Sequence, residues 1–107
     1  MARVIVREWR GRADVNRPDA YPEHFRNVVA PELSGVDGFL GADLVRRDLD
    51  DSIEFTVISR WASMNAVRDF AGDDPERAVV EPGAVAALRD FDARVVHYLV
   101  VDHVKVS

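Results

Sequence analysis

The chain is 107 residues long, 48% of them hydrophobic, with a formal net charge of −5. This length predicts one domain, residues 1–107, and favours a second copy as partner, because a small domain buries only part of its apolar surface. The acidic balance, without long blocks of like charge, argues against binding to nucleic acid or to an anionic membrane. The absence of cysteine excludes disulfides, thiolate metal ligands and cysteine nucleophiles.

The first stretch, RVIVREW at residues 3–9, is rich in β-branched and aromatic residues and predicts a strand that ends at Gly11. Ile5, Arg7 and Trp9 share one face of this strand. Its apolar run is too short for a signal peptide or a membrane span. A cytoplasmic protein is therefore expected.

An amphipathic helix is predicted next, because apolar residues recur at helical intervals. These residues are Tyr21, Phe25, Val28, Val29 and Leu33. Asp19 and Pro22 suit its start, and Pro31 and Gly35 are expected to end or bend it.

Residues 38–61 predict a hairpin, since two alternating runs flank a polar tip at residues 50–52. The second run places its more apolar set on one face: Ile53, Phe55, Val57, Ser59 and Trp61. The aspartate pairs at 50–51 and 73–74 are interpreted as turn and cap residues that form local hydrogen bonds.

Ser63 suits the start of a second helix that ends at Gly72. A helix start signal recurs at Asp74 and Pro75, and another helical turn or two is predicted after Pro82 and Gly83. Residues 93–106 give the strongest strand signal in the chain. Val95, His97, Leu99 and Val101 alternate there with Val96, Tyr98 and Val100.

The order of predicted elements is βαββαβ, that of an α+β, ferredoxin-like fold with an antiparallel sheet. Its helices cover one face of the sheet and leave the other open. Both sides of the last strand are apolar, so we expect the open face to pack against an identical sheet in a homodimer.

The chain resembles the antibiotic biosynthesis monooxygenase family over nearly its whole length. The resemblance rests on the order of elements, the pattern RW.S..A...FAG from Arg60 to Gly72, and the closing V.HY.VV from Val95 to Val101. Members of that family are dimeric α+β barrels with a cavity between helices and sheet in each subunit. The resemblance implies oxygenation of a small aromatic or polyketide-like substrate, with molecular oxygen as cosubstrate and neither metal nor flavin.

The resemblance also implies residues that line the cavity. Trp61 matches a tryptophan that the family places at the end of its third strand, often in the cavity wall, and simple core packing is the alternative. Further candidates for substrate contact are Trp9, Tyr21, His24 and Phe25. Their alternatives are core packing for the first two and for Phe25, and a surface position for His24.

His97 is the candidate catalytic base, because an imidazole exchanges protons near neutral pH and this one lies among apolar neighbours. A structural histidine with satisfied hydrogen bonds is the alternative. Arg7 is a charged residue on a covered strand face, and the first interpretation is a structural ion pair with Glu8 or Glu54. The second interpretation, on which Arg7 is the candidate catalytic partner of a substrate oxyanion, is the one that the chemistry implied by the resemblance would use.

No metal site is predicted, because no pair of histidines has the spacing of metal ligands. The haem-degrading members of the family carry an asparagine on the first strand and an iron-ligating histidine in the helix after the tryptophan. Here the first strand reads Arg7, Glu8, Trp9, and Phe70 and Ala71 stand in that helix. Haem is therefore not expected.

Two other functions are compatible with the same residues. A non-oxidative cyclase or isomerase would use the same histidine and pocket without oxygen. A dimer that only binds a small hydrophobic molecule would need no catalytic residue. The sequence favours the monooxygenase through the family resemblance and not through a catalytic signature. Both other functions stay open, because fold alone does not determine function.

Overall fold

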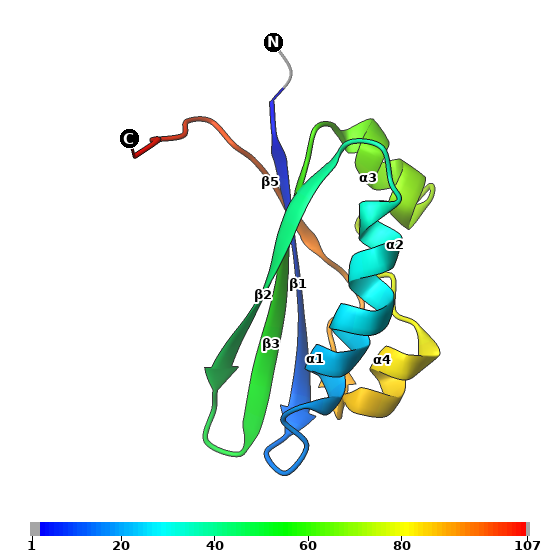
Figure 1. Cartoon of the computed structure of the whole chain (residues 1–107), viewed down its shortest axis with the longest axis vertical. Coiled ribbons are helices and arrows are strands. Elements are labelled where there is room, and N and C mark those ends of the chain that lie inside the picture. The colour runs from blue at the N-terminus through cyan, green and yellow to red at the C-terminus, as the bar shows by residue number, and fades with distance from the viewer. Residues whose placement is uncertain (1–2, 107) are drawn as a thin grey trace.

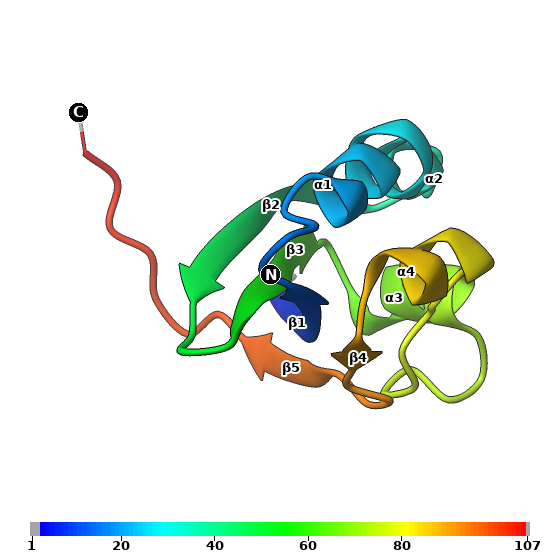
Figure 2. The same ribbon diagram turned by 90° about the horizontal axis from the view of Figure 1, so that it is seen from below.

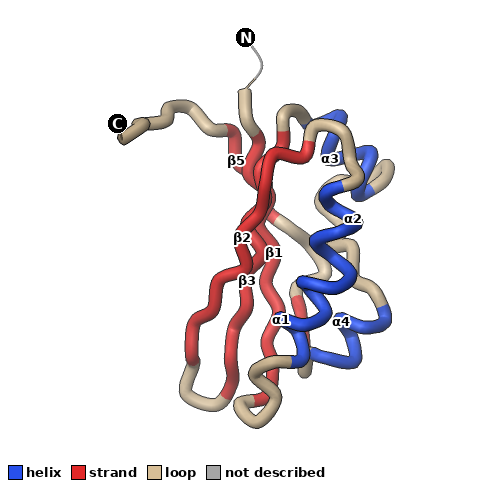
Figure 3. Tube along the Cα trace, in the orientation of Figure 1, coloured by secondary structure: helices blue, strands red, loops and turns tan. Residues whose placement is uncertain are grey.

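A computed structural model describes residues 3–106. The elements in chain order are β1 Ile5–Asp14, α1 Ala20–His24, the π-helical segment η1 Phe25–Val29, α2 Ala30–Ser34, β2 Phe39–Asp48, β3 Ser52–Trp61, α3 Met64–Ala71, α4 Pro82–Ala87, β4 Asp90–Phe91 and β5 Val96–Leu99. The strands form one antiparallel sheet in the order β2-β3-β1-β4, and β5 also pairs with β1. The helices lie together on one side of this sheet (Figures 1, 2 and 3). The α+β, ferredoxin-like prediction is confirmed.

β1 is the central strand and is longer than predicted. Gly11 does not end it but pairs with Phe55 on one side and Phe91 on the other. A Cβ on Gly11 would lie 2.7 Å from Leu88 Cδ1. The glycine therefore marks a close approach of the segment after α4 to the strand, which is a common reason for glycine inside a sheet.

The first helix is continuous from residue 20 to residue 34, although its middle is a π-helical turn. Ala30 N donates to Phe25 O, five residues earlier. A proline inside an α-helix normally collides with the carbonyl four residues before it. Here the wider π turn comes directly before Pro31, and the helix runs on to Ser34 with Gly35 at its end.

Residues 73–81 contain no helix, so the helix start expected at Asp74 and Pro75 is wrong. Arg77 instead forms an isolated β-bridge with Arg94. The Arg7 side chain also donates hydrogen bonds to the carbonyl oxygens of Pro75 and Arg77. These tertiary hydrogen bonds hold the segment extended across the helix side of the sheet.

The predicted last strand, residues 93–106, is shorter than expected, because only β5 lies within it. The short strand β4 comes before this range and was not predicted. β4 and β5 pair with opposite ends of β1, and Val100 N makes one further bond to Val4 O, of 2.9 Å. Residues 101–106 form no strand because they run past the end of their neighbour, β1. They lead away from the sheet (Figure 1).

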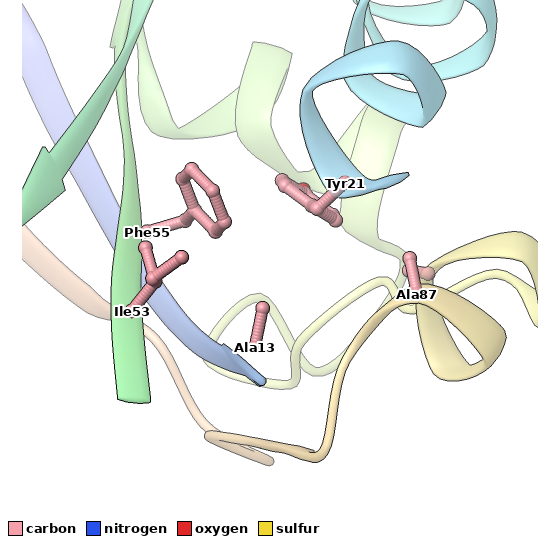
Figure 4. Close-up of a cluster of buried hydrophobic side chains, with 6 residues drawn as sticks. Ala13, Tyr21, Ile53, Phe55 and Ala87 are labelled. Atoms are coloured by element: carbon pink, nitrogen blue, oxygen red, sulfur yellow. The ribbon is translucent and has the colours of Figure 1, made fainter. Parts of the chain in front are cut away.

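Two hydrophobic clusters attach the helices to the sheet. In the first, Tyr21 of α1 faces Ile53 and Phe55 of β3, together with Ala13 and Ala87 (Figure 4). The second cluster contains Ile5, Leu33, Trp61, Ala66 and Val67. The more apolar set that the sequence places on one face of β3, from Ile53 to Trp61, lies on the side of these clusters. None of the helices in residues 3–106 is long and apolar enough to cross a membrane.

Candidate functional site

A cavity lies between the helices and the sheet, where the resemblance implies one. It is lined by side chains of both hydrophobic clusters and by a few polar groups: Arg7, Trp9, Tyr21, His24, Val29, Leu33, Val57, Ser59, Phe70, Val79, Glu81, Ala84 and Val95. Its volume of about 50 Å³ admits a few water molecules. A larger ligand has to displace the side chains that close it.

Arg7 is the buried cation of this cavity, with 5% of its surface exposed. Its guanidinium donates to the carbonyl oxygens of Pro75 and Arg77, and its Nη1 lies 3.0 Å from His97 Nε2. Burial lowers the pKa of Arg7 to about 10. None of its partners in the described part of the chain is a carboxylate, so an anion that enters the cavity would meet a positive charge without a counter-ion.

The ion pair suggested for Arg7 is not formed. Glu8 pairs with Arg10, and Glu54 pairs with Arg47 at 2.9 Å. Side chains alternate along a strand, so both glutamates point to the sheet face opposite Arg7. The prediction of a carboxylate partner for Arg7 is therefore wrong. Within residues 3–106 its guanidinium contacts two carbonyl groups and the His97 imidazole, and it lies 5.8 Å from the centroid of the Phe70 ring.

His97 lies on β5, directly opposite Arg7 of β1, and does not line the cavity. Burial, and then the charge of Arg7, lowers its pKa. Because a guanidinium can only donate, His97 Nε2 accepts the hydrogen bond from Arg7 and the ring is neutral. The two residues nominated as catalytic thus lie together, but only Arg7 faces the cavity. The prediction that His97 is the proton acceptor is not tested by this arrangement, in which its accepting nitrogen is already bound by Arg7.

Trp61 is a core residue in the structure, with 0% of its surface exposed. Its indole nitrogen donates to Ser59 Oγ over 2.9 Å, and its ring lies 5.3 Å from Phe39 and 5.5 Å from Phe70, between centroids. It does not line the cavity, and neither does Phe25, which packs against the first cluster. Trp61 instead supports Ser59 and Phe70, which do line it.

Trp9, Tyr21 and His24 form an aromatic wall, as their candidacy for substrate contact requires. The Trp9 indole donates to Asp92 O over 2.8 Å. Ring centroids are 5.7 Å apart between Trp9 and Tyr21, and 5.9 Å apart between Tyr21 and His24. The surface position considered for His24 is wrong, since its side chain is only 9% exposed.

Sequence reasoning did not find Glu81, which lies directly before α4 and lines the cavity. Its Oε1 is 3.9 Å from His24 Nε2. Burial, and then the hydrogen bond and charge of Glu32, raises its pKa. Its place before Pro82 and Gly83 marks only a helix start in the sequence, so no local signal connects it with His24.

Comparison with known proteins agrees with this architecture. Residues 3–82 match the family model described as antibiotic biosynthesis monooxygenase. The chain belongs to this family. None of the curated proteins matches it in sequence.

Solved structures share the fold of this antibiotic biosynthesis monooxygenase domain. A heme-degrading protein from Mycobacterium tuberculosis is 19% identical with a TM-score of 0.68, covering 98% of this chain and 99% of its own. A monooxygenase from Streptomyces coelicolor, solved with nanaomycin D, is 17% identical with a TM-score of 0.66. The match covers 99% of this chain and 94% of that protein. A cofactor-independent oxygenase from Streptomyces nogalater is 21% identical with a TM-score of 0.58. The match covers 98% of this chain and 97% of that protein.

The residues of this family member do not fit a haem ligated from α3. Phe70 stands in that helix, packs against Trp61 and lines the cavity, so it offers no nitrogen to an iron. Within residues 3–106, no group of three or more histidine, aspartate or glutamate side chains is arranged to hold a metal ion.

Proposed function

We propose that this domain is a cofactor-independent monooxygenase for a small acidic aromatic substrate, such as an anthrone, bound between the helices and the sheet. The observation that carries the proposal is the buried guanidinium of Arg7, which lines the cavity and has no carboxylate partner among residues 3–106. An enolate or phenolate supplies the missing negative charge. Family membership and the two oxygenases of the same fold support an oxygenase over other uses of the cavity.

The chemistry needs a desolvated anion and dioxygen. Removal of a proton from the acidic CH₂ group leaves a carbanion whose charge spreads to the neighbouring oxygen, where Arg7 stabilises it. The anion reduces dioxygen and forms a carbon–oxygen bond, and the peroxide then loses water. The CH₂ carbon becomes a ketone, one oxygen atom stays in the product, and the other leaves as water with both hydrogens. No external reductant is required.

Ligand entry and the charge of Arg7 are linked in this proposal. Arg7 holds the segment 73–81 across the cavity through the carbonyl oxygens of Pro75 and Arg77. A substrate anion competes for the same donors and so loosens the cover as it binds. His97 accepts from the guanidinium and positions it, while Trp9 and Tyr21 supply a surface against which an aromatic ring can pack.

Oxygen uptake with an anthrone tests the function. We expect uptake and quinone absorbance above the rate without protein, and Arg7→Met should lower kcat/KM about 10²–10³-fold, the cost of removing one oxyanion donor. Arg60→Met is the matched control, because Arg60 lies on the opposite sheet face and pairs with Asp43.

The alternatives give different results in the same assay. Conversion of substrate without oxygen uptake would indicate a cyclase or isomerase. Binding without conversion would indicate a binding protein. Equal rates for Arg7→Met and Arg60→Met would contradict the role of Arg7.

A homodimer completes the proposal. The sheet face opposite the helices exposes Val45, Val96 and Tyr98 by 43%, 46% and 48%. The charges on this face are largely paired within it, as in Glu8 with Arg10 and Glu54 with Arg47. A second copy can therefore cover the apolar side chains without burying many unpaired charges.

A further inference from the structure

His24 is a buried polar side chain of the cavity that the chemistry above does not use. Its Nε2 is buried without a hydrogen-bond partner among residues 3–106. Nearly all buried polar atoms in proteins are hydrogen-bonded, and an unpaired one costs about 1–3 kcal/mol. An unpaired imidazole nitrogen in the lining of a cavity indicates a place for a ligand group.

The ring of His24 is held in place by its neighbours. A Cβ on Gly83 would lie 2.6 Å from His24 Nδ1, so only glycine lets α4 approach the ring this closely. Tyr21 packs beside it with 5.9 Å between ring centroids. The imidazole is thus fixed between α1 and α4 before any ligand binds, which a group that takes part in catalysis requires.

Glu81 completes the geometry. Its Oε1 lies 3.9 Å from His24 Nε2, too far for a hydrogen bond but suited to an ion pair with a protonated ring. One hydroxyl oxygen can lie about 2.8 Å from both atoms at this separation. A substrate hydroxyl that reaches His24 therefore meets the carboxylate as well.

Glu81 and Tyr21 are the titratable side chains that border His24. Burial, and then the hydrogen bond and charge of the neighbouring Glu32, raise the pKa of Glu81. Burial and then the charge of Glu81 raise the pKa of Tyr21, which stays protonated and is no competing base. The nearest cation of the cavity lining is Arg7 on β1, which holds the substrate anion.

We propose that His24 is the catalytic base of this cavity and that Glu81 stabilises the imidazolium it forms, an inference that rests on the proposed function. Nε2 takes a proton from the substrate, whose C–H or O–H bond breaks and leaves its electron pair on the anion beside Arg7. The imidazolium then protonates the peroxide formed with dioxygen. Nε2 removes the second C–H proton as hydroxide leaves, and returns that proton to the hydroxide to give water.

Turnover gives the first test. His24→Gln should lower kcat/KM for the anthrone about 10²–10⁴-fold, the usual contribution of general base catalysis, and Glu81→Gln should lower it about tenfold or more. His103→Gln is the matched control, because His103 is exposed near the end of the chain. A rate for folded His24→Gln within about threefold of the control would overturn the proposal.

Proton transfer to His24 can also be measured without oxygen, with 3-nitrophenol as the probe, because this phenol is mostly neutral in free solution at neutral pH. Wild-type protein should bind it as the coloured phenolate while imidazole ¹⁵N resonances report His24 in its doubly protonated form. In His24→Gln the bound phenol should stay neutral. Bound phenol that is neutral in wild-type protein, no binding at all, or phenolate that forms equally in His24→Gln would overturn the assignment.

The two measurements separate this inference from the proposed function. Phenolate formation at His24 without oxygen uptake would contradict the oxygenase and support the base. Oxygen uptake that is the same in His24→Gln as in wild-type protein would support the oxygenase and contradict His24 as the base. If His24→Gln fails to fold, Glu81→Gln decides, since an unchanged rate and an unchanged fraction of phenolate in that variant would overturn the pair.

Discussion

At Arg7 the structure combines two carbonyl oxygens and a neutral imidazole where a carboxylate was expected. This arrangement keeps the guanidinium charged and in place without cancelling its charge. His97 is therefore tied to Arg7 through its Nε2, and a proton on that nitrogen would end the hydrogen bond and place two cations together. The protonation of His97 and the stability of the folded chain are linked for this reason.

The first prediction at this scale concerns acid stability. The pKa of His97 is lower in the folded chain than in the unfolded one, so the unfolded state binds more protons, and stability falls as pH drops from about 6.5 towards the folded pKa. His97→Gln should show a smaller loss of unfolding free energy between about pH 8 and about pH 5. Urea unfolding of both proteins measures it, with His103→Gln as control. An equal loss in His97→Gln would contradict the linkage.

Among the elements, α3 shows how a short local signal decides a boundary. Ser63 lies at the end of the turn after β3 and accepts a hydrogen bond from Ala66 N over 3.1 Å. This satisfies one of the amide groups that a helix start leaves free. The helix it begins positions Phe70, which lines the cavity and packs against Trp61.

Removing this cap should destabilise the chain by a predictable amount. Ser63→Ala should lower the free energy of unfolding by about 1 kcal/mol, the usual value for a lost helix cap. Ser34→Ala is the control, because the exposed Ser34 hydroxyl only donates to Ala30 O within its own helix, and it should change stability by less than about 0.5 kcal/mol. Similar values for the two variants in urea unfolding would contradict the role of Ser63.

Elements with local signals were predictable from the sequence, and elements decided by distant contacts were not. The hairpin and the Ser63 helix follow from alternation and capping within a few residues. The expected helix at Asp74 and Pro75 fails because Arg7 binds two carbonyl oxygens of that segment. The last strand is shorter than predicted because β1, its neighbour, begins at Ile5.

The candidate site also contains residues that the sequence could nominate and one that it could not. Arg7, Trp9, Tyr21 and His24 were nominated by residue type and by their place on a strand or helix face, and all four line the cavity. Glu81 could not be nominated, because its chemistry depends on His24, which lies far away in the chain. A sequence read alone contains no signal for such a pairing.

In the molecule as a whole, the two faces of the sheet differ. One face holds both hydrophobic clusters and the cavity, while the other has no covering element in residues 3–106 (Figure 2). The apolar residues of β5 predicted to mediate self-association, Val96 and Tyr98, lie on that uncovered face and are about half exposed. This is the arrangement that a second sheet can cover.

The dimer proposal predicts a change of mass on substitution. Tyr98→Glu should weaken self-association about 10²-fold or more, because a carboxylate without a partner in an interface costs several kcal/mol. Val85→Glu is the control, since Val85 is 51% exposed but lies on α4, away from the open face. Sedimentation velocity measures both. Wild-type protein that sediments as one chain at every concentration would contradict the dimer.

Residues 101–106 are a second exposed apolar part of the molecule, next to the uncovered sheet face. Val101, Val104 and Val106 are 79%, 85% and 90% exposed, on backbone that pairs with no strand in residues 3–106. A free valine-rich segment of this kind is a template for pairing with any other chain that has an open edge. A dimer in which the second copy also pairs with residues 101–106 would protect this segment from aggregation, so that variants unable to form it would lose solubility at high concentration as well as their partner.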